Sequence, residues 1–589
     1  MIRLFFIDYR RRFDGTVSLE SDVVERSVPS SLKRSSNGKS FFVGELFGCG
    51  ESDFFSSHWE EEPGRLNEGC SALYAVTYDE KSCVFAADIS GRELLFYYYT
   101  DDRLVLSDSL WGVLKRIQPG FEGVDKDSLA ESIVMGGGFP CDHSTPVKHL
   151  KWLGANCVGR FDACSWARDV HSYGDIRRSG EIVDVDEAVE QFDAAMRRMA
   201  FCLGERHPDA VFGLGLSGGL DSRTALHYLL DAGLKLECFN VGKARPHGVL
   251  LASSLKRAHE LANISRINYC NVEWQPHSIR SKMDLMLENQ PFGTGGHYTN
   301  AYKYESEGRP RFDVLVGGGQ AIGPMLVGVS VFNHSDKMSV DDLCAYLLHL
   351  AIGEVRAYAY TENSIRKQMR QLGASRVDIE GGKNREQWDA IVGEGAYGRT
   401  ARKVRSFVED CALRGYKPAD ITLDYRTRAL GPTGRNGAYE SGLGTEKSYT
   451  IYTPFLIRDA LRWDAPLVEE RRVLKELIAA KIPEYTEIGE EMFGSTKVNQ
   501  SNLSLFAQKA AFMMRGSGIM TDDWYSRHPA IRKAFLEDMT SPYKWFYELF
   551  PSAQDYEGIW NMSPSRMNSL WEAKRVVDCM ESKRYLEFE

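Results

Sequence analysis

Residues Val211–Tyr228 read VFGLGLSGGLDSRTALHY, and this stretch decides the fold. An apolar run of strand length is followed by the turn SGGLDS and then by leucines at helical spacing. The two glycines let the backbone approach an anion closely, and the free amides at a helix N-terminus point at it. The stretch therefore predicts a strand, a turn and a helix that together form a phosphate site.

The polar side chains of the turn fit such a site. Ser217 and Ser222 add hydroxyl donors, and Asp221 places a carboxylate beside the phosphates. A carboxylate is favourable there only when Mg²⁺ lies between it and the phosphate oxygens. The spacing is not that of the GxxxxGK[ST] loop, because no lysine follows the second glycine. A strand-turn-helix unit with two glycines arising by chance is the plain alternative.

SGGLDS after an apolar strand resembles the pyrophosphate loop of the ATP pyrophosphatases, which split ATP into AMP and pyrophosphate. The wider sequence is similar to the asparagine synthetase-like amide ligases, which include β-lactam synthetases and lasso-peptide cyclases. The resemblance covers most of residues 60–330 and 420–500. It implies an α/β protein with an N-terminal αββα domain of the Ntn glutaminase type at residues 1–180. The implied second domain, at 181–589, is a doubly wound parallel-sheet ATP-pyrophosphatase domain with a helical extension.

The N-terminal part is rich in short β-prone runs. A first strand is expected in MIRLFFIDYRRRF, and a β-meander over 72–78, 83–87, 94–99 and 104–107. Asp88, Gly91 and Ser107-Asp108 match turn and strand-end positions of the family's glutaminase-like domain. That family's glutaminases need a first mature cysteine as nucleophile. Ile2 follows Met1 here and the first cysteine is Cys49, so we expect no glutaminase activity.

Strands and helices alternate around SGGLDS. Helices are expected at 185–203 and 253–262, and strands at 235–241, 267–272 and 313–319. This alternation favours a parallel doubly wound sheet, whose ligands lie beyond the carboxyl ends of the strands. Helices are also expected over 340–420 and from 506 to the end. The resemblance implies an ATP and pyrophosphate site made of Leu216, Ser217, Gly218, Gly219, Asp221, Ser222, Val241, Gly242, Gly317 and Gly319.

Two positions depart from the family pattern. Ala321 stands where the family has its second metal aspartate, and Gly318 stands where many relatives carry a catalytic side chain. The resemblance therefore leaves Asp221 as the Mg²⁺ ligand. It also implies that Lys497, in the stretch GSTKVNQS, reaches the pyrophosphate and the charged intermediate. A merely solvated lysine is the alternative.

Composition excludes several classes of protein. The net charge of −10 argues against a general nucleic-acid binder. No apolar run approaches the roughly 18 residues that a membrane span needs. The 12 cysteines are scattered without CxxC pairs, a pattern that fits reduced thiols in a cytoplasm.

The reaction implied by the resemblance is adenylation of a carboxylate by ATP and Mg²⁺, followed by attack of an amine to give an amide and AMP. The partners are then a small-molecule or peptide carboxylate and an amine acceptor. The sequence leaves the oligomeric state undecided. Ala321 favours one alternative, a non-catalytic nucleotide-binding or scaffolding homologue. An asparagine synthetase using ammonia is another. A tRNA-modifying pyrophosphatase is disfavoured by the acidic charge, and a glutamine-dependent synthetase by Ile2.

Overall fold

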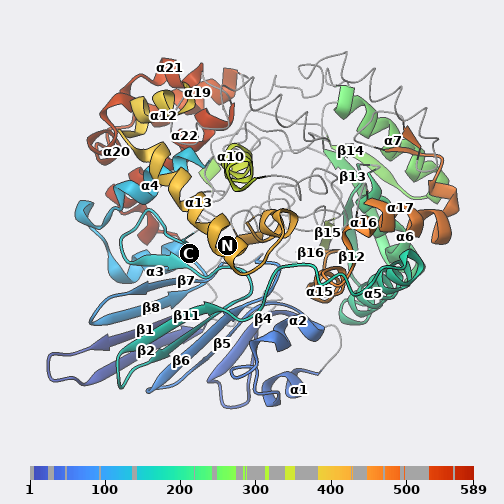
Figure 1. The fold of residues 1–589 in the computed structure, drawn as a ribbon, viewed down its shortest axis with the longest axis horizontal. Helices are drawn as coiled ribbons and strands as arrows, with labels where there is room; N and C mark the ends of the chain where they lie inside the picture. The colour runs from blue at the N-terminus through green and yellow to red at the C-terminus, as the bar shows by residue number, and fades with distance from the viewer. Residues whose placement is uncertain are drawn as a thin grey trace.

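The computed structural model describes residues 5–23, 32–46, 50–91, 94–135, 142–217, 219–241, 249–272, 283–284, 287, 312–317, 339–351, 383–425, 427–428, 448–468, 471–490, 496–497, 529–561 and 564–588. Two antiparallel sheets form the N-terminal part and lie at the bottom of Figure 1. A parallel sheet lies apart from them, and the C-terminal helices gather at the upper left. The α/β class expected from the sequence is confirmed.

The two antiparallel sheets face each other. The first has the order β2-β1-β8-β7-β9 and the second the order β11-β10-β6-β5-β4-β3. Their strands are β1 (Phe5–Arg11), β2 (Val17–Val23), β3 (Leu32–Arg34), β4 (Ser40–Leu46), β5 (Cys70–Tyr78), β6 (Ser82–Ala87), β7 (Phe96–Tyr99), β8 (Arg103–Ser107), β9 (Leu150–Trp152), β10 (Cys157–Asp162) and β11 (Ala167–Ser172). The expected first strand is therefore confirmed as β1.

Alternating side chains on these strands fill three apolar layers. Phe41 packs between the two sheets against Phe5, whereas its neighbour Phe42 points outward to Phe54 and Trp59. Helices α1 (Glu51–Ser56) and α2 (Leu66–Gly69) supply that outer layer, and α3 (Leu110–Ile117) packs on β1, β7 and β8 of the other sheet. Helix α4 (Lys126–Val134) follows α3 in the chain. The order of layers is helix, sheet, sheet, helix.

The expected single β-meander is wrong, because the chain changes sheets between β6 and β7. The buried Asp88 carboxylate accepts hydrogen bonds from the Ser90 and Gly91 amides and the Ser90 hydroxyl. Gly91 has a φ of +56°, and a Cβ there would lie 2.7 Å from the Cβ of Ala155. This tight turn, whose residues the sequence had singled out, directs the chain from the second sheet into the first.

The second part contains a five-stranded parallel sheet of order β14-β13-β12-β15-β16. Its strands are β12 (Val211–Gly215), β13 (Lys235–Val241), β14 (Tyr269–Val272), β15 (Val314–Gly317) and β16 (Ser448–Thr450). The chain runs outward from β12 to β14 and then returns to the other side of β12. This is a doubly wound order, and its switch point lies between β12 and β15.

Helices accompany the parallel sheet. They are α5 (Val185–Arg206), α6 (Leu220–Asp231), α7 (Val249–Ser265), α15 (Pro454–Ala460), α16 (Ala465–Val468) and α17 (Arg472–Lys481). Helix α6 packs on β12, β13 and β15, and α17 packs on α5 and α6. The predicted domain boundary at 180/181 falls between β11 and α5 and stays a prediction.

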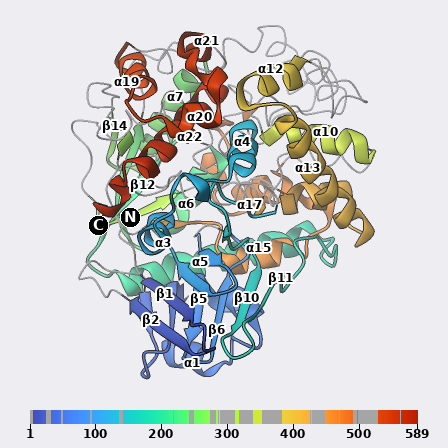
Figure 2. The ribbon, with the colours of Figure 1, turned by 90° about the vertical axis from the view of Figure 1, so that its left-hand side faces the viewer.

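The remaining described α-helices pack on one another and on α4 of the N-terminal part. They are α10 (Val340–Ala351), α12 (Lys383–Val392), α13 (Ala396–Leu413), α19 (Pro529–Met539), α20 (Trp545–Leu549), α21 (Tyr556–Trp560) and α22 (Pro564–Glu581). Helices α13 and α22 both contact α4 of the N-terminal part, and Figure 2 shows α22 beside α4. Where the structure describes them, the helical tracts expected over 340–420 and near the C-terminus are confirmed. Within the described part of the chain, no helix is long and apolar enough to cross a bilayer.

A partly buried imidazole at the edge of the N-terminal sheet predicts a pH dependence of stability. His143 packs on Trp152, with 4.7 Å between ring centroids, and its Nε2 is buried with no hydrogen-bond partner among the described residues. Burial lowers the pKa of His143 to about 3, and Arg428 and Lys151 act in the same direction. The folded protein therefore keeps this ring neutral over a range in which the unfolded chain binds a proton.

We expect the unfolding free energy to fall as the pH decreases from about 6.5 towards 3, by up to about 1.4 kcal/mol per pH unit from this group. The stability is present above the unfolded pKa and is lost towards the folded one, because the unfolded state binds the extra proton. Urea unfolding across this range should show a shallower slope for His143→Gln than for the parent. The exposed His171 gives the matched control, His171→Gln, and equal slopes for parent and His143→Gln would contradict the prediction.

Candidate functional site

The turn after β12 begins at Leu216, a residue that is hydrogen-bonded to the neighbouring strand β13. Leu216 is buried, its amide donates to the Phe239 carbonyl at 2.7 Å, and its carbonyl accepts from Asn240 Nδ2 at 2.9 Å. Both backbone groups of Leu216 are thus tied to the neighbouring strand β13. The turn begins at the carboxyl end of β12, beside the switch point where doubly wound sheets bind ligands.

The serines of the turn bind its backbone. The Gly219 amide donates to Ser217 Oγ at 3.2 Å, and Ser222 Oγ donates to the Gly219 carbonyl at 3.0 Å. The two hydroxyl oxygens lie 3.4 Å apart. These contacts give both serines a part in shaping the turn, and their expected donation to a phosphate stays a prediction.

Helix α6 starts at this turn without a side-chain cap. Its N-cap residue is Gly219, which has extended backbone (φ −69°, ψ 164°) and no side chain to satisfy the first helical amides. Amides at an uncapped N-terminus and the positive end of the helix dipole attract anions. The phosphate site expected from the sequence at this end of α6 stays a prediction.

Asp221, in the first turn of α6, has a partner on each carboxylate oxygen. The Tyr452 hydroxyl donates to Oδ1, and Arg471 Nη1 lies 3.2 Å from Oδ2. The two ionised side chains are largely buried, at 17% exposure for Asp221 and 15% for Arg471. Burial and the neighbouring Asp221 charge hold the pKa of Tyr452 far above its usual value, so its hydroxyl remains a donor.

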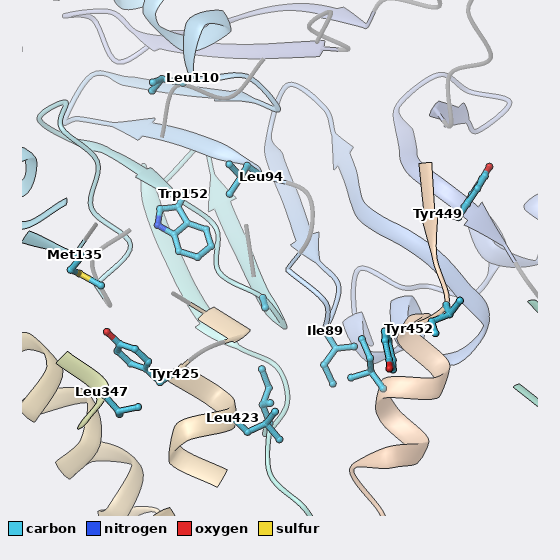
Figure 3. Packing of buried hydrophobic residues seen from close by; sticks show 14 of the residues in the cluster. Ile89, Leu94, Leu110, Met135, Trp152, Leu347, Leu423, Tyr425, Tyr449 and Tyr452 are labelled. Carbon is cyan, nitrogen blue, oxygen red and sulfur yellow. The ribbon is translucent and has the colours of Figure 1, made fainter. Parts of the chain in front are cut away.

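Tyr452 and Arg471 were not among the expected site residues. Tyr452 follows β16 and its ring belongs to the same packed apolar cluster as Ile89 of the N-terminal part (Figure 3). Arg471 immediately precedes α17. Both approach Asp221 from more than 200 positions away along the chain, so no local sequence pattern indicated the contact.

Arg223, two residues after Asp221 in α6, was also missed. It is fully buried, and its Nη1 donates to the carbonyls of Tyr485 at 3.0 Å and Ile488 at 2.8 Å. A signal was present, because Arg223 lies midway between Leu220 and Leu226, where the helical spacing calls for an apolar residue. A charged residue on that stripe indicates a buried hydrogen-bonded group.

Arg223 brings the chain carrying Lys497 close to α6. Strand β17 (Gly489–Glu490) starts directly after Ile488 and pairs with β18 (Thr496–Lys497), with Gly489 opposite Lys497. The Lys497 backbone is therefore anchored next to the segment that Arg223 holds. The part of the structure described here does not include the Lys497 side chain, and its expected contact with pyrophosphate stays a prediction.

The other expected ligand positions lie at strand ends. Val241 ends β13 and Gly317 ends β15, the two strands that flank β12. Because all three strands are parallel, Leu216, Val241 and Gly317 meet at one edge of the sheet. Gly218, Gly242, Gly318, Gly319 and Ala321 lie outside the described residues.

The donor set at this edge suits Mg²⁺ only as part of a nucleotide complex. No group of three His, Cys, Asp or Glu side chains that would hold a metal occurs among the described residues. Mg²⁺ commonly uses one or two carboxylates and completes its shell with waters and substrate phosphates. Asp221 fits that role, provided that it shares its oxygens with Tyr452 and Arg471.

Comparisons with known proteins do not assign this chain to a family. No protein-family model matches the chain, and no curated protein matches it. Among solved structures, it is similar to a glutamine phosphoribosylpyrophosphate amidotransferase from B. subtilis complexed with ADP and GMP, with a TM-score of 0.17 and 11% identity. That similarity covers 40% of this chain and 59% of the amidotransferase, less than two thirds of its length. At this level it carries no argument about function.

Proposed function

We propose that this protein is an ATP-dependent, AMP-forming amide ligase whose nucleotide site is the SGGLDS turn. The observation that carries the proposal is the placement of this turn at the switch point of a doubly wound parallel sheet, leading into the uncapped α6. Asp221 stands in the first turn of that helix. The resemblance of SGGLDS to the ATP-pyrophosphatase loop supplies the reaction class.

The proposed domains follow the same division. Residues 1–180 form a glutaminase-type domain, supported by the helix, sheet, sheet, helix layering. Residues 181–589 form the ATP-pyrophosphatase domain, supported by the strand order of the parallel sheet. The substrates are a small-molecule or peptide carboxylate and an amine.

In the proposed reaction, a carboxylate oxygen attacks the α-phosphorus of ATP, and the bond to the bridging oxygen of pyrophosphate breaks. The amine nitrogen then attacks the acyl carbon, loses a proton, and AMP leaves with the electrons of the acyl–oxygen bond. A bound Mg²⁺ supplies charge neutralisation for the leaving pyrophosphate.

The chain's own groups position and stabilise charge. The turn amides and the α6 N-terminus hold phosphate oxygens, where preorganised dipoles stabilise developing negative charge. Tyr452 and Arg471 fix the orientation of Asp221. Lys497 is our candidate for stabilising the tetrahedral oxyanion.

A second function rests on a specific observation. Because both oxygens of Asp221 already have protein partners and Ala321 supplies no second carboxylate, the same turn in a scaffolding homologue would bind nucleotide without cleaving it. The ligase and the scaffolding homologue would therefore both bind ATP, and they would differ only in whether ATP is cleaved.

The experiment is to incubate the purified full-length chain with ATP, Mg²⁺ and a panel of carboxylates and amines, and to quantify AMP, ADP and pyrophosphate. We expect AMP and pyrophosphate in equal amounts, formed only with the correct carboxylate. Nucleotide binding without turnover across the panel would favour the scaffolding function. Formation of ADP in place of AMP would contradict the proposed chemistry.

A further inference from the structure

The C-terminal segment, residues 582–588, packs against helix α3 of the N-terminal part. Its short helix η13 (Arg584–Leu586) contacts α3, and the C-terminus lies beside α3 in Figures 1 and 2. Tyr585 stacks on Trp111, with 6.1 Å between ring centroids and 6° between ring planes. Phe588 packs edge-on against the same indole, and its carbonyl accepts a hydrogen bond from Lys115. Both ends of the chain therefore contribute to one buried contact.

A third segment joins this contact from the connection between β14 and β15. Trp111 Nε1 donates a hydrogen bond of 2.8 Å to the carbonyl of Leu287. The Asp284 carboxylate pairs with Arg575 of α22 and lies 3.2 Å from Nη1 of Arg584. The Trp111 and Leu287 side chains are each 2% exposed. The indole therefore stands between the C-terminal segment and residues of the second part of the chain.

The connection that reaches Trp111 begins at the edge of the sheet where the nucleotide is expected. Strand β14 ends at Val272 and runs parallel to β13, which runs parallel to β12. Its carboxyl end therefore lies on the same edge as the SGGLDS turn, and ligands of doubly wound sheets bind beyond that edge. The connection returns as β15, the strand that flanks β12 at the switch point.

We propose that the N-terminal part supports nucleotide binding in the second part. Trp111, with the C-terminal segment as a clamp, holds Asp284 and Leu287 and so fixes the path of the connection that leaves the nucleotide edge. The inference rests on the proposed function, because it requires ATP at that edge. It gives the N-terminal part a role that needs no glutaminase nucleophile.

Thermodynamic linkage gives the inference a signature. If the contact at Trp111 favours ATP binding, ATP stabilises the contact by the same factor. Mg²⁺ and ATP together should therefore slow backbone hydrogen exchange in peptides covering 283–287 and 582–588. A contact that contributes only to overall stability would change the free energy of unfolding, but not the ATP affinity of the folded protein.

The test compares Trp111→Phe with the parent, both as the full-length chain. The substitution keeps a ring on which Tyr585 can stack and removes the hydrogen bond to Leu287. We expect ATP binding, measured by isothermal titration with Mg²⁺ present, to weaken by about five-fold, the usual effect of one lost hydrogen bond. Hydrogen exchange of peptides covering 283–287 should become faster by a similar factor.

A matched control makes the same substitution elsewhere in the N-terminal part. Trp59 is fully buried in the outer apolar layer, and its Nε1 has no hydrogen-bond partner among the residues that the structure describes. Trp59→Phe therefore removes the same ring atoms without breaking a contact to the second part. It should leave the ATP affinity and the exchange of 283–287 at the parent's values, whatever its effect on thermal unfolding.

A second variant keeps the test decisive if Trp111→Phe fails to fold. Arg584→Gln removes one of the two arginines that pair with Asp284, at a side chain that is 40% exposed. It should weaken ATP binding and reduce the protection that ATP gives to the C-terminal segment. Arg532→Gln, which breaks an exposed pair with Glu557, should do neither.

Two outcomes overturn the inference, and they can be told apart. If the parent binds ATP and the folded variants bind it equally well, the contact at Trp111 is only structural and the proposed function still stands. If the parent does not bind ATP, the nucleotide site itself is wrong, and the proposed function fails together with this inference.

Discussion

Replacing Asp221 with asparagine should lower AMP formation by at least about 100-fold, the scale of loss when a group that stabilises transition-state charge is removed. Under the proposed function, Asp221 is the only carboxylate that the resemblance places at the pyrophosphate, because Ala321 stands at the second metal position of the asparagine synthetase-like ligases. An amide oxygen keeps the size of the side chain but loses the charge that holds Mg²⁺. Tyr452 can still donate to it, so the fold around the turn should survive.

The measurement is the rate of AMP release at saturating ATP and Mg²⁺, with circular dichroism as the check on folding. Asp231→Asn is a matched control, because Asp231 lies at the other end of α6 and is paired with Arg197 at 2.5 Å. It should leave the rate nearly unchanged. AMP formation indifferent to Asp221→Asn would defeat the mechanism.

The converse substitution, Ala321→Asp, separates a depleted catalytic site from a scaffolding module. Restoring a second carboxylate should tighten Mg²⁺ binding in an active enzyme. If no variant forms AMP with any substrate, while nucleotide still binds, the scaffolding function is the better account.

Local sequence patterns predicted the elements around the site well. The strand, turn and helix at Val211–Tyr228 were predictable because apolar periodicity and paired glycines act within a few residues of each other. The alternation of strands and helices also predicted the parallel sheet. Each of these inferences depended on neighbours in the sequence.

What the sequence did not reveal depends on distant contacts. Strands β6 and β7 both have strand-like patterns, but no pattern states which sheet a strand joins, so the change of sheets at Asp88–Gly91 was missed. Tyr452 and Arg471 meet Asp221 across 231 and 250 residues. A tyrosine before a helix and an arginine in an exposed-looking run carry no local sign of such a contact.

The second large effect is expected where the two parts of the chain meet. Replacing Arg428 with methionine should destabilise the protein by about 3–5 kcal/mol. The substitution removes the nearer counter-charge of the buried Asp424 carboxylate and leaves it only the half-exposed Arg414, whose Nη2 lies 3.7 Å from Oδ2. Asp424 is fully buried, and Arg428 Nε lies 2.5 Å from its Oδ1. Arg428 also contacts Cys157 Sγ at 3.4 Å and Ser172 Oγ at 3.2 Å, which join residues 418–428 to β10 and β11.

Urea unfolding at pH 7 measures the loss. The matched control is Lys533→Met, which removes an exposed pair with Glu537 at the same i,i+4 spacing and a distance of 4.0 Å. Exposed pairs of this kind contribute about 0.3–0.5 kcal/mol. Adding Asp424→Asn to Arg428→Met should recover part of the stability, because the buried charge that lost its nearer partner is then gone.

The pH dependence of the unfolding free energy of Arg428→Met shows whether the buried charge causes the loss of stability. Burial raises the pKa of Asp424 even in the parent, and Arg428 opposes this shift. Without Arg428 the folded pKa should rise further above the unfolded value, so the folded state binds a proton that the unfolded state releases. The unfolding free energy should then be greatest at low pH and decline as the pH rises through the folded pKa of Asp424. This decline with pH should be steeper in the variant than in the parent. If the variant loses the same free energy at every pH, the damage comes from lost packing and hydrogen bonds to β10 and β11 rather than from the buried charge.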